Sequence, residues 1–231
     1  WESLFADERG EEALDRLIHA VPRDGISFVI ARPDEHFFPI EELRNCCNTV
    51  FRREGAQILQ LGPSDGYPPL KEVLLELLGG EGLAVKDENL LITDGCQQSL
   101  DLICKAFLRS GDSVLLENPT YPGAIAIFGG ARVRCLGVPV RTDAAAGSPG
   151  VDLEVLEATL LQNRVKLMVL TPDFHNPTGT SLPLAARRRL LEIAARYQVP
   201  IVEDHIYGRL RISGDRVPSL KQLDRPNIVI Q

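Results

Sequence analysis

Four short segments of the chain carry residue types that could contact a ligand. In the first, Gly95, Cys96 and Gln97 lie where an apolar run gives way to a helical pattern. The first N–H groups of a helix are free and the helix dipole is positive there, so such a turn favours a phosphate group. These residues could equally form an ordinary tight turn, because they match neither a Walker loop nor GxGxxG.

Two further segments hold aromatic and carboxylate side chains. Tyr121, beside Pro122, can present a flat ring to a planar ligand, although an isolated tyrosine is more often a packing residue. Asp204 follows a run of apolar residues, so we expect its carboxylate at or just past the end of a strand. A salt-bridged surface position is the alternative for Asp204. Tyr207, three residues later, can bring a phenol to the same region.

The fourth segment is an elaborate turn, 176–179, directly behind the apolar run 165–170. That run predicts a buried strand, because it is short, contains β-branched residues and is bounded by turn residues. Asn176 and its neighbours Pro177 and Gly179 each favour bends for their own steric reasons, so turn chemistry alone could explain the segment. A role in ligand binding is indicated only when this turn is considered together with the other three segments.

The elements that must position these segments alternate along the chain after residue 88. Short apolar runs predict strands at 90–93, 113–117, 133–138, 165–170, 199–202 and 227–230. Longer amphipathic runs predict helices at 96–109, 120–128 and 152–162, and one more that is capped by Ser181 with Pro183 in its first turn. This alternation is typical of βαβ units and predicts an α/β fold, a three-layer sandwich with a mainly parallel sheet. Ligands bind outside the carboxyl ends of the strands in such sheets, so the four segments should face one cleft.

Composition and charge exclude several classes of protein. The chain has 231 residues, 44% of them hydrophobic, which is enough for one large domain or two small ones. Its formal net charge is -7, and acidic and basic residues are interspersed along the sequence. The sequence therefore has no basic segment of the kind that binds nucleic acid or an anionic membrane. Five scattered cysteines without a CxxC pair signal neither a disulfide framework nor a metal site, which favours a reducing cytoplasm. No apolar run reaches the ~18 residues of a membrane span.

Taken in order, the segments resemble the class I/II aminotransferases, the fold-type I enzymes that use pyridoxal 5'-phosphate. The matching motifs lie at 93–98, 118–123, 176–179 and 203–207, and 37–44 and 62–74 resemble the family's amino-terminal half. The similarity is greatest to the aminoadipate and kynurenine aminotransferase branch and to the aminotransferase-like domain of MocR-type GntR regulators. The resemblance covers nearly the whole chain.

The resemblance implies a cofactor site. Its residues would be Gly95, Cys96 and Gln97 at the cofactor phosphate, Tyr121 stacked on the pyridine ring, Asp204 at the ring nitrogen, and Asn176 and Tyr207 at the ring hydroxyl oxygen. A carboxylate beside the pyridine nitrogen favours the protonated ring, which then accepts electrons from a substrate carbanion. Hydrogen-bond donors at the ring oxygen stabilise its negative charge.

The resemblance also implies a domain plan of an amino-terminal arm at 1–40 and a large cofactor-binding domain at 41–231. The only methionine is Met168, so we expect the chain to be a piece of a longer protein. We expect the family's small carboxy-terminal domain to be absent and its Schiff-base lysine to lie beyond Gln231, because no lysine here lies in the family's motif. The chain by itself should then contain no catalytic residue and should not transaminate.

Three positions depart from the family's pattern. Leu61 stands where the family usually has a tyrosine that reaches the neighbouring subunit's phosphate, and Ala31 where it usually has a glycine beside the substrate carboxylate. Asp94 places a negative charge next to the expected phosphate, which it would repel at short range.

Two functional classes follow from the resemblance, together with a third and more remote one. The first is a homodimeric aminotransferase acting on an amino acid and a 2-oxo acid. The second is the effector-sensing domain of a GntR/MocR-type transcriptional regulator. The third is a nucleotide-binding α/β domain without pyridoxal chemistry, which would require the four motifs to coincide by chance.

Overall fold

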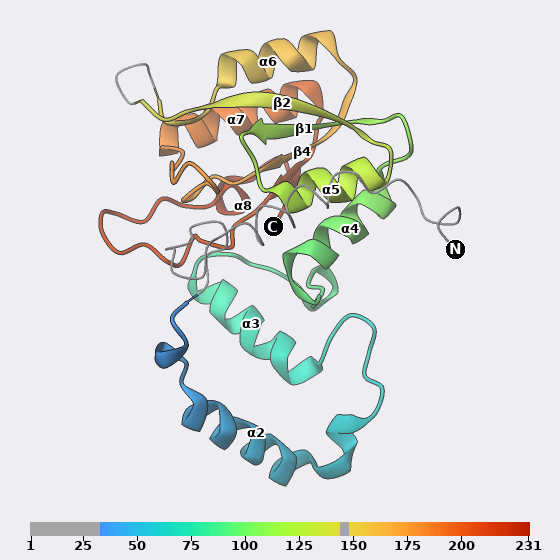
Figure 1. Ribbon diagram of the computed structural model, residues 1–231, viewed down its shortest axis with the longest axis vertical. Coiled ribbons are helices and arrows are strands. Elements are labelled where there is room, and N and C mark those ends of the chain that lie inside the picture. The colour runs from blue at the N-terminus through green and yellow to red at the C-terminus, as the bar shows by residue number, and fades with distance from the viewer. Residues whose placement is uncertain (1–32, 144–147) are drawn as a thin grey trace, which may run out of the picture. The chain divides into compact units, whose positions relative to one another are not determined.

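The computed structural model describes residues 33–143 and 148–231 (Figure 1). These residues belong to two compact units, Trp1–Leu70 and Lys71–Gln231. Most of the predicted amino-terminal arm therefore lies outside the described residues, as does Ala31, and the domain boundary at residue 40 stays a prediction.

The first unit is helical over much of its described length. A 3-10 turn, η2 (Glu35–Phe37), precedes helix α2 (Ile40–Glu54), and a second one, η3 (Gly55–Leu59), follows it. Acidic residues in the first turn of α2 and arginines in its last turn complement the helix dipole. Gly55, with a φ of 58°, ends α2 in a conformation that glycine adopts at little steric cost. Helix α3 (Pro68–Gly80) begins in this unit and continues into the second.

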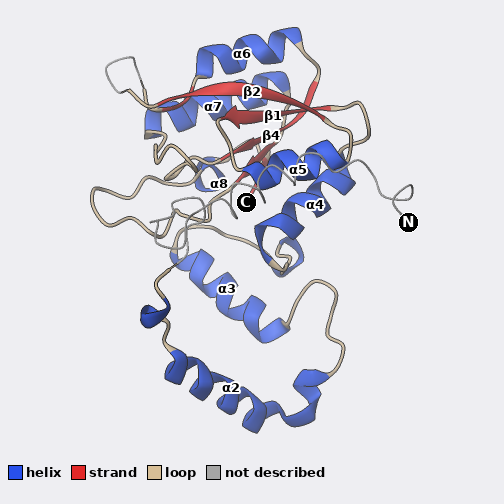
Figure 2. Cartoon of the chain, in the orientation of Figure 1, coloured by secondary structure: helices blue, strands red, loops and turns tan. Residues whose placement is uncertain are grey.

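A six-stranded sheet runs through the second unit (Figure 2). Its strands are β1 (Ser113–Asn118), β2 (Arg134–Arg141), β3 (Gly150–Val151), β4 (Val165–Leu170), β5 (Ile201–Glu203) and β6 (Val229–Ile230). The order across the sheet is β3-β2-β1-β4-β5-β6, and every neighbouring pair is parallel except β2 with β3. The predicted mainly parallel sheet is confirmed.

Helices cover both faces of this sheet. They are α4 (Gly95–Phe107) and α5 (Pro122–Gly130) on one face, and α6 (Leu153–Gln162), α7 (Leu184–Tyr197) and α8 (Leu220–Leu223) on the other (Figure 1). Successive side chains of β1 point to opposite faces, so Val114 and Leu116 pack with α4 and α5 while Leu115 packs with α6 and α7. The predicted three-layer arrangement is confirmed. No helix in the described part of the chain is both long and apolar enough to cross a membrane.

One predicted strand does not form. Residues 90–93 are irregular, between a 3-10 turn, η4 (Asp87–Asn89), and helix α4, and Leu91 is more than half exposed. A strand needs a hydrogen-bonded neighbour, and a short apolar run cannot by itself show that one is available. The other strands and helices predicted from the sequence agree with the structure to within a few residues.

The predicted cap of α7 is also wrong. The helix begins at Leu184, and Pro183, which we expected inside its first turn, occupies the capping position without a side-chain bond. The Ser181 hydroxyl instead accepts the N–H of Phe174 at 3.1 Å. A contact across the preceding loop has therefore taken the place of a helix cap.

Candidate cofactor site

The sheet has a topological switch point between β1 and β4. From β1 the chain moves to β2 on one side, whereas β4 and β5 lie on the other side. In sheets of this kind a ligand crevice lies outside the carboxyl ends of the strands at the switch. Because β1, β4 and β5 are parallel, the segments that follow Asn118, Leu170 and Glu203 leave the sheet at the same edge. Three of the four predicted ligand segments are these segments.

The fourth predicted segment is the start of helix α4. Gly95 has a φ of 81°, a conformation that is easy for glycine and strained for other residues. Asp94, just before the helix, makes no side-chain cap bond, and its own N–H donates to Gln98 Oε1 at 2.6 Å. The first-turn N–H groups of α4 therefore lack the side-chain acceptor that commonly satisfies them. They are donors at the positive end of the helix dipole.

Two side-chain contacts tie this helix start to the strand-end segments. Cys96 Sγ lies 4.0 Å from Asp204 Oδ2, and Gln97 Nε2 donates to the Tyr121 hydroxyl at 2.9 Å. The two pairs join residues that are 108 and 24 positions apart in the sequence. The structure thus brings Cys96, Gln97, Tyr121 and Asp204, with Gly95 next to them, into one neighbourhood.

The position of the Tyr121 ring depends on a glycine. A Cβ atom at Gly123 would lie 2.4 Å from Tyr121 Cε1, so the ring occupies space that any other residue at 123 would fill. Tyr121 has the extended backbone expected before Pro122, which begins α5. The ring is half-buried and also packs against the core cluster beneath α4 and α5. The position of the Tyr121 ring is therefore compatible with a packing role and with contact to a ligand.

Asp204 lies immediately after β5. Its N–H donates to Leu170 O at 2.9 Å, and its Oδ1 accepts the N–H of Ile206 at 3.3 Å. Burial raises the pKa of Asp204 above its ordinary value, and the Ile206 N–H together with His205 and His175 acts in the opposite direction. Within the described part of the chain, no lysine, arginine or histidine forms an ion pair with this carboxylate.

Asn176 and Tyr207 lie in the two segments that follow β4 and β5, and both are half-buried. The turn that carries Asn176 is closed by two backbone bonds, from His175 N to Thr180 O and from Gly179 N to His175 O. Among the described residues, neither side chain hydrogen-bonds another predicted site residue. Their part in the site stays a prediction.

A buried pair of titratable side chains, Glu117 and His175, contacts this turn, and the sequence analysis missed it. The Glu117 carboxylate at the end of β1 accepts the N–H of Thr171 at 2.8 Å and lies 3.3 Å from His175 Nε2. His175 Nδ1 lies 2.8 Å from Thr178 Oγ1 within the turn. Burial raises the pKa of Glu117, while His175 and the Thr171 N–H oppose that shift. One feature of the sequence could have indicated this pair. Glu117 is a charged residue within an apolar strand, at a position where the neighbouring strand residues are buried.

A second buried network, centred on Arg187, holds the flanks of the same turn. Arg187 is 0% exposed, and its guanidinium donates to Asp173 Oδ1 at 2.7 Å. It also donates to three backbone carbonyls, those of Pro172, Leu182 and Pro218. Arg187 is the first of three consecutive arginines in α7, and nothing in the local sequence distinguishes it from its neighbours.

Comparison with known proteins shows the family. The chain belongs to the class I and II aminotransferases, whose family model matches residues 30–229. It is 38% identical over 229 residues to the 2-aminoadipate transaminase of Thermus thermophilus, a match that covers 97% of this chain and 55% of that protein. It is also 31% identical over 159 residues to the uncharacterized HTH-type transcriptional regulator YjiR of Escherichia coli, covering 69% of this chain and 33% of the regulator.

Solved structures lead to the same family. The kynurenine aminotransferase of Pyrococcus horikoshii, in complex with PMP, has a TM-score of 0.85 and 31% identity. LysN, the alpha-aminoadipate aminotransferase of Thermus thermophilus, complexed with N-(5'-phosphopyridoxyl)-L-leucine, has a TM-score of 0.83 and 37% identity. Each comparison covers 99% of this chain and 57% of the other. The chain thus spans a little over half the length of these relatives.

Proposed function

We propose that this chain is the cofactor-binding part of an aminotransferase that transfers an amino group between an amino acid and a 2-oxo acid, with pyridoxal 5'-phosphate as cofactor. The observation that carries the proposal is the half-buried Asp204 carboxylate, which has no cation partner in the described part of the chain. It lies within 4.0 Å of Cys96, at the start of α4. A protonated pyridine nitrogen fits the place of the missing cation.

The first turn of α4 fits the cofactor phosphate. The N–H groups at Gly95, Cys96 and Gln97 have no side-chain cap, and the helix dipole adds positive potential. Asp94 is exposed, so its carboxylate has solvent to turn toward. The repulsion noted from the sequence is therefore no obstacle to a phosphate at this turn.

The remaining residues fit the ring. Tyr121, held by Gln97 and packed over Gly123, would stack on one face of the pyridine, and Asn176 and Tyr207 would donate to the ring hydroxyl oxygen. Bound pyridoxal phosphate supplies an electron sink for the bonds at the α-carbon of an amino acid. The Asp204 carboxylate would hold a proton on the ring nitrogen, because a negative charge beside a base favours its protonated form.

None of the five lysines is assigned a catalytic role. Lys71, Lys86, Lys105 and Lys221 form ion pairs with Asp87, Glu88, Asp101 and Asp224. Lys166 is an exposed residue near the amino end of β4, at the edge of the sheet opposite the strand-end segments. The proposal for this chain is therefore one of cofactor binding, and the transfer reaction is proposed for the whole protein.

The test is a titration with pyridoxal 5'-phosphate, followed by absorbance and by the rise in thermal unfolding temperature that a bound ligand causes. Asp204→Asn should weaken binding of the cofactor roughly tenfold. A carboxylate beside the protonated ring nitrogen raises the pKa of that nitrogen by about one unit or more, and each unit is a factor of ten in the binding constant. Asp101→Asn is the matched control, because Asp101 pairs with Lys105 on the exposed side of α4. Equal affinities for wild type and Asp204→Asn would remove the assignment.

A second function is favoured by the match to YjiR and other HTH-type regulators. In that case the same site would bind the cofactor as an effector-sensing domain of a GntR/MocR-type regulator. The reading frame of the full-length gene distinguishes the two functions. A helix-turn-helix domain encoded ahead of Trp1 supports the regulator, and a frame without one supports the enzyme.

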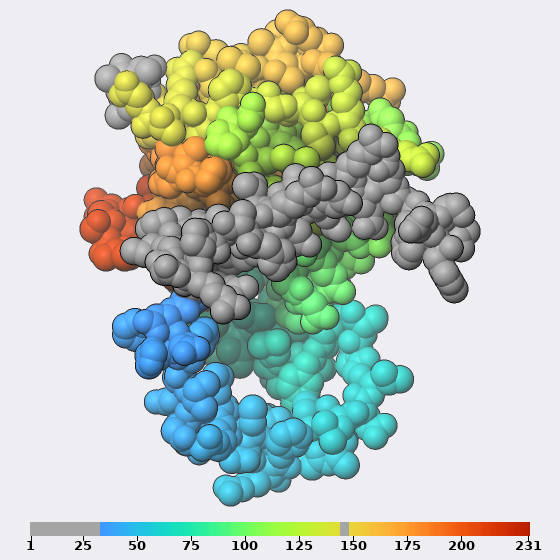
Figure 3. All heavy atoms as spheres, viewed as in Figure 1, coloured from blue at the N-terminus to red at the C-terminus, as the bar shows by residue number. Residues whose placement is uncertain are grey.

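We also propose a cytoplasmic homodimer. Residues 37–61, the blue to cyan part of the surface in Figure 3, carry several exposed large apolar side chains: Phe37, Phe38, Ile40, Leu43, Phe51, Leu59 and Leu61. Such a concentration of apolar surface is typical of an interface with another chain. Light scattering on the purified protein measures the mass in solution, and a monomer at all concentrations would contradict the dimer.

A further inference from the structure

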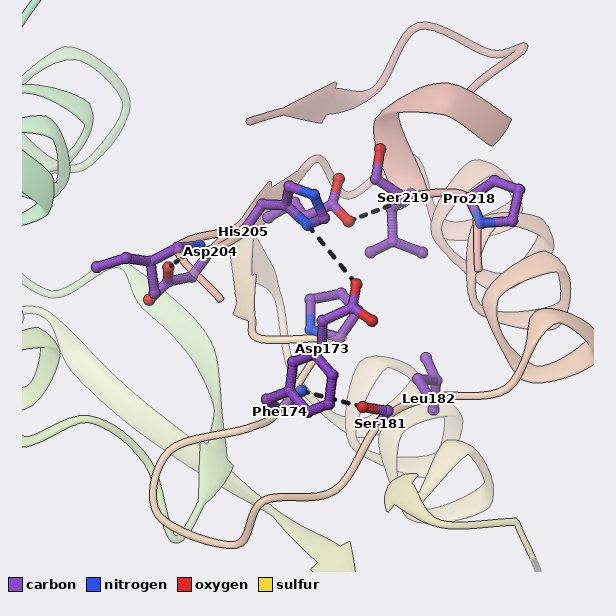
Figure 4. Close-up of polar contacts among 12 residues, drawn as sticks. Asp173, Phe174, Ser181, Leu182, Asp204, His205, Pro218 and Ser219 are labelled. Carbon is purple, nitrogen blue, oxygen red and sulfur yellow. Dashed lines mark hydrogen bonds and ion pairs between the residues drawn. The ribbon is translucent and has the colours of Figure 1, made fainter. Parts of the chain in front are cut away.

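Two buried polar atoms face each other without a hydrogen bond. They are Asp173 Oδ2, in the loop after β4, and His205 Nδ1, in the segment after β5, and they lie 3.6 Å apart (Figure 4). The other oxygen of Asp173 is held by Arg187 at 2.7 Å and approached by Arg211 Nη2 at 3.3 Å. Asp173 therefore has a fixed position, with one oxygen left for the imidazole.

The chemistry of the pair decides the tautomer of His205. A carboxylate oxygen only accepts, so the approach is favourable only when Nδ1 carries a proton. Burial lowers the pKa of His205; Arg187 and Arg216 act in the same direction, and Asp173 and Glu81 oppose them. A neutral imidazole with its proton on Nδ1 satisfies both the geometry and this balance of charges.

A glycine lies against the imidazole at Cε1 and both ring nitrogens, and a Cβ atom there would lie 2.6 Å from Nδ1. A Cβ atom at Gly208 would lie 2.0 Å from His205 Cε1 and 2.2 Å from Nε2. Gly208 also donates its N–H to His205 O, closing a turn. The ring thus packs against the Gly208 backbone while its Nδ1 faces Asp173, and a side chain at position 208 would displace the ring.

We propose that His205 and Asp173 are positioning residues of the cofactor site, an inference that rests on the proposed function. Their contact ties the segment that carries Asp204 and Tyr207 to the loop that carries Asn176. The backbone itself links these segments through the bond from Asp204 N to Leu170 O. Beyond that bond, the side chain of Asp173 contacts the segment after β5 through His205 and Arg211. Displacing the imidazole would leave the Asp204 carboxylate and the Tyr207 phenol less well oriented.

Substitutions at His205 separate positioning from simple packing. Asparagine places an N–H donor near the position of Nδ1, whereas glutamine places one near the position of Nε2. His205→Asn should therefore keep pyridoxal-phosphate affinity near that of wild type, while His205→Gln and His205→Leu should lose roughly tenfold, as misplaced site groups do. Gly208→Ala should resemble His205→Gln, because it displaces the ring without removing it.

A second readout does not depend on the cofactor. In 15N-labelled protein, His205 should show the Nδ1-protonated neutral tautomer at pH 7.5, which is about 1 unit above the ordinary imidazole pKa. The amide resonances of Asp204 and Tyr207 should move more in His205→Leu than in His205→Asn. Thermal unfolding of each variant shows whether it is folded.

The outcomes separate the two proposals. If wild type binds the cofactor, Asp204→Asn weakens binding and His205→Leu does not, the positioning role is wrong and the cofactor site stands. Equal behaviour of His205→Asn and His205→Gln in both readouts also overturns the positioning role. If wild type fails to bind the cofactor, the proposed function fails. The amide shifts of Asp204 and Tyr207 then report separately whether His205 orders their segment.

Discussion

The thiol of Cys96 lies 4.0 Å from the carboxylate of Asp204, although 108 positions separate the two residues in the sequence. Burial, together with the Asp204 charge, raises the pKa of the thiol to about 11. The thiol is therefore neutral at physiological pH and can donate a weak hydrogen bond to the carboxylate. This contact joins the start of α4 to the segment that follows β5.

Cys96 should react slowly with thiol reagents. The thiolate is the nucleophile, and a pKa of about 11 leaves very little of it at pH 8. With iodoacetamide and peptide mass analysis, the exposed Cys46 and Cys47 should be modified well before Cys96. Modification of Cys96 at the rate of Cys46 would show that its thiol is not held against Asp204.

Gly123→Ala should weaken cofactor binding about as much as Tyr121→Ala, because the new methyl group must displace the Tyr121 ring. We expect a loss of roughly tenfold for each, since aromatic stacking on a base is worth about 1–3 kcal/mol. Gly129→Ala is the control, because a Cβ there meets nothing within 4 Å on the same helix. An absorbance titration checks the prediction, which is wrong if the two glycine variants bind equally well.

Arg187→Leu should destabilise the fold by about 3–5 kcal/mol, because it removes the shortest ion pair of the buried Asp173 carboxylate, at 2.7 Å, and leaves only the longer contact with Arg211 at 3.3 Å and with His205 at 3.6 Å. Arg187→Lys should recover only part of this loss, since an ammonium group lacks the planar fork of donors that reaches three carbonyls as well. Arg188→Leu, at the exposed position next to it, should change stability by no more than about 0.5 kcal/mol. Urea unfolding curves measure all three, and equal effects of the two leucine variants would contradict the role of Arg187.

Glu203 predicts a dependence of stability on pH. Burial raises its pKa from the ordinary 4.5 to about 7, although the N–H groups of Leu220 and Lys221 partly oppose the shift. Since the folded pKa lies above the unfolded one, this contribution to the free energy of unfolding is fully present below about pH 4.5 and is lost as the pH rises through about 7.

Wild type should therefore lose stability relative to Glu203→Gln between about pH 5 and pH 8, by on the order of 3 kcal/mol at most. Urea unfolding across this range measures the difference between the two proteins, so that other titrating groups cancel. A difference that stays constant, or that changes in the opposite direction, would show that the Glu203 pKa is not raised.

The 231-residue chain should form no covalent adduct with pyridoxal 5'-phosphate at a specific lysine. Four of the lysines pair with carboxylates, and Lys166 lies toward the amino end of β4. Borohydride reduction after incubation with the cofactor, followed by peptide mass analysis, tests this. One saturable adduct of defined stoichiometry on a single lysine would identify a catalytic residue that we have not assigned.

The sequence by itself determined the alternation of strands and helices and the order of the ligand segments. The run 165–170 forms β4 and 152–162 forms α6, with Asp152 as its cap, because short apolar runs and amphipathic periodicity act locally. The strand expected ahead of Cys96 and Gln97, at 90–93, does not form, so strand ends did not predict their place beside Asp204 and Tyr121. The placement of Tyr121 and Asp204 at one edge of the sheet was predictable. Parallel strands carry their carboxyl ends to one edge whatever the details of packing.

Only the tertiary structure decided which polar residues are buried together. Asp173, Arg187 and His205 come from a loop, a helix and a strand end, and no local pattern pairs them. The same holds for Glu117 with His175, and for Ser181, whose hydroxyl serves Phe174 rather than α7. A buried charge is stable only beside a partner, and that partner is chosen by the folding of distant segments onto one another.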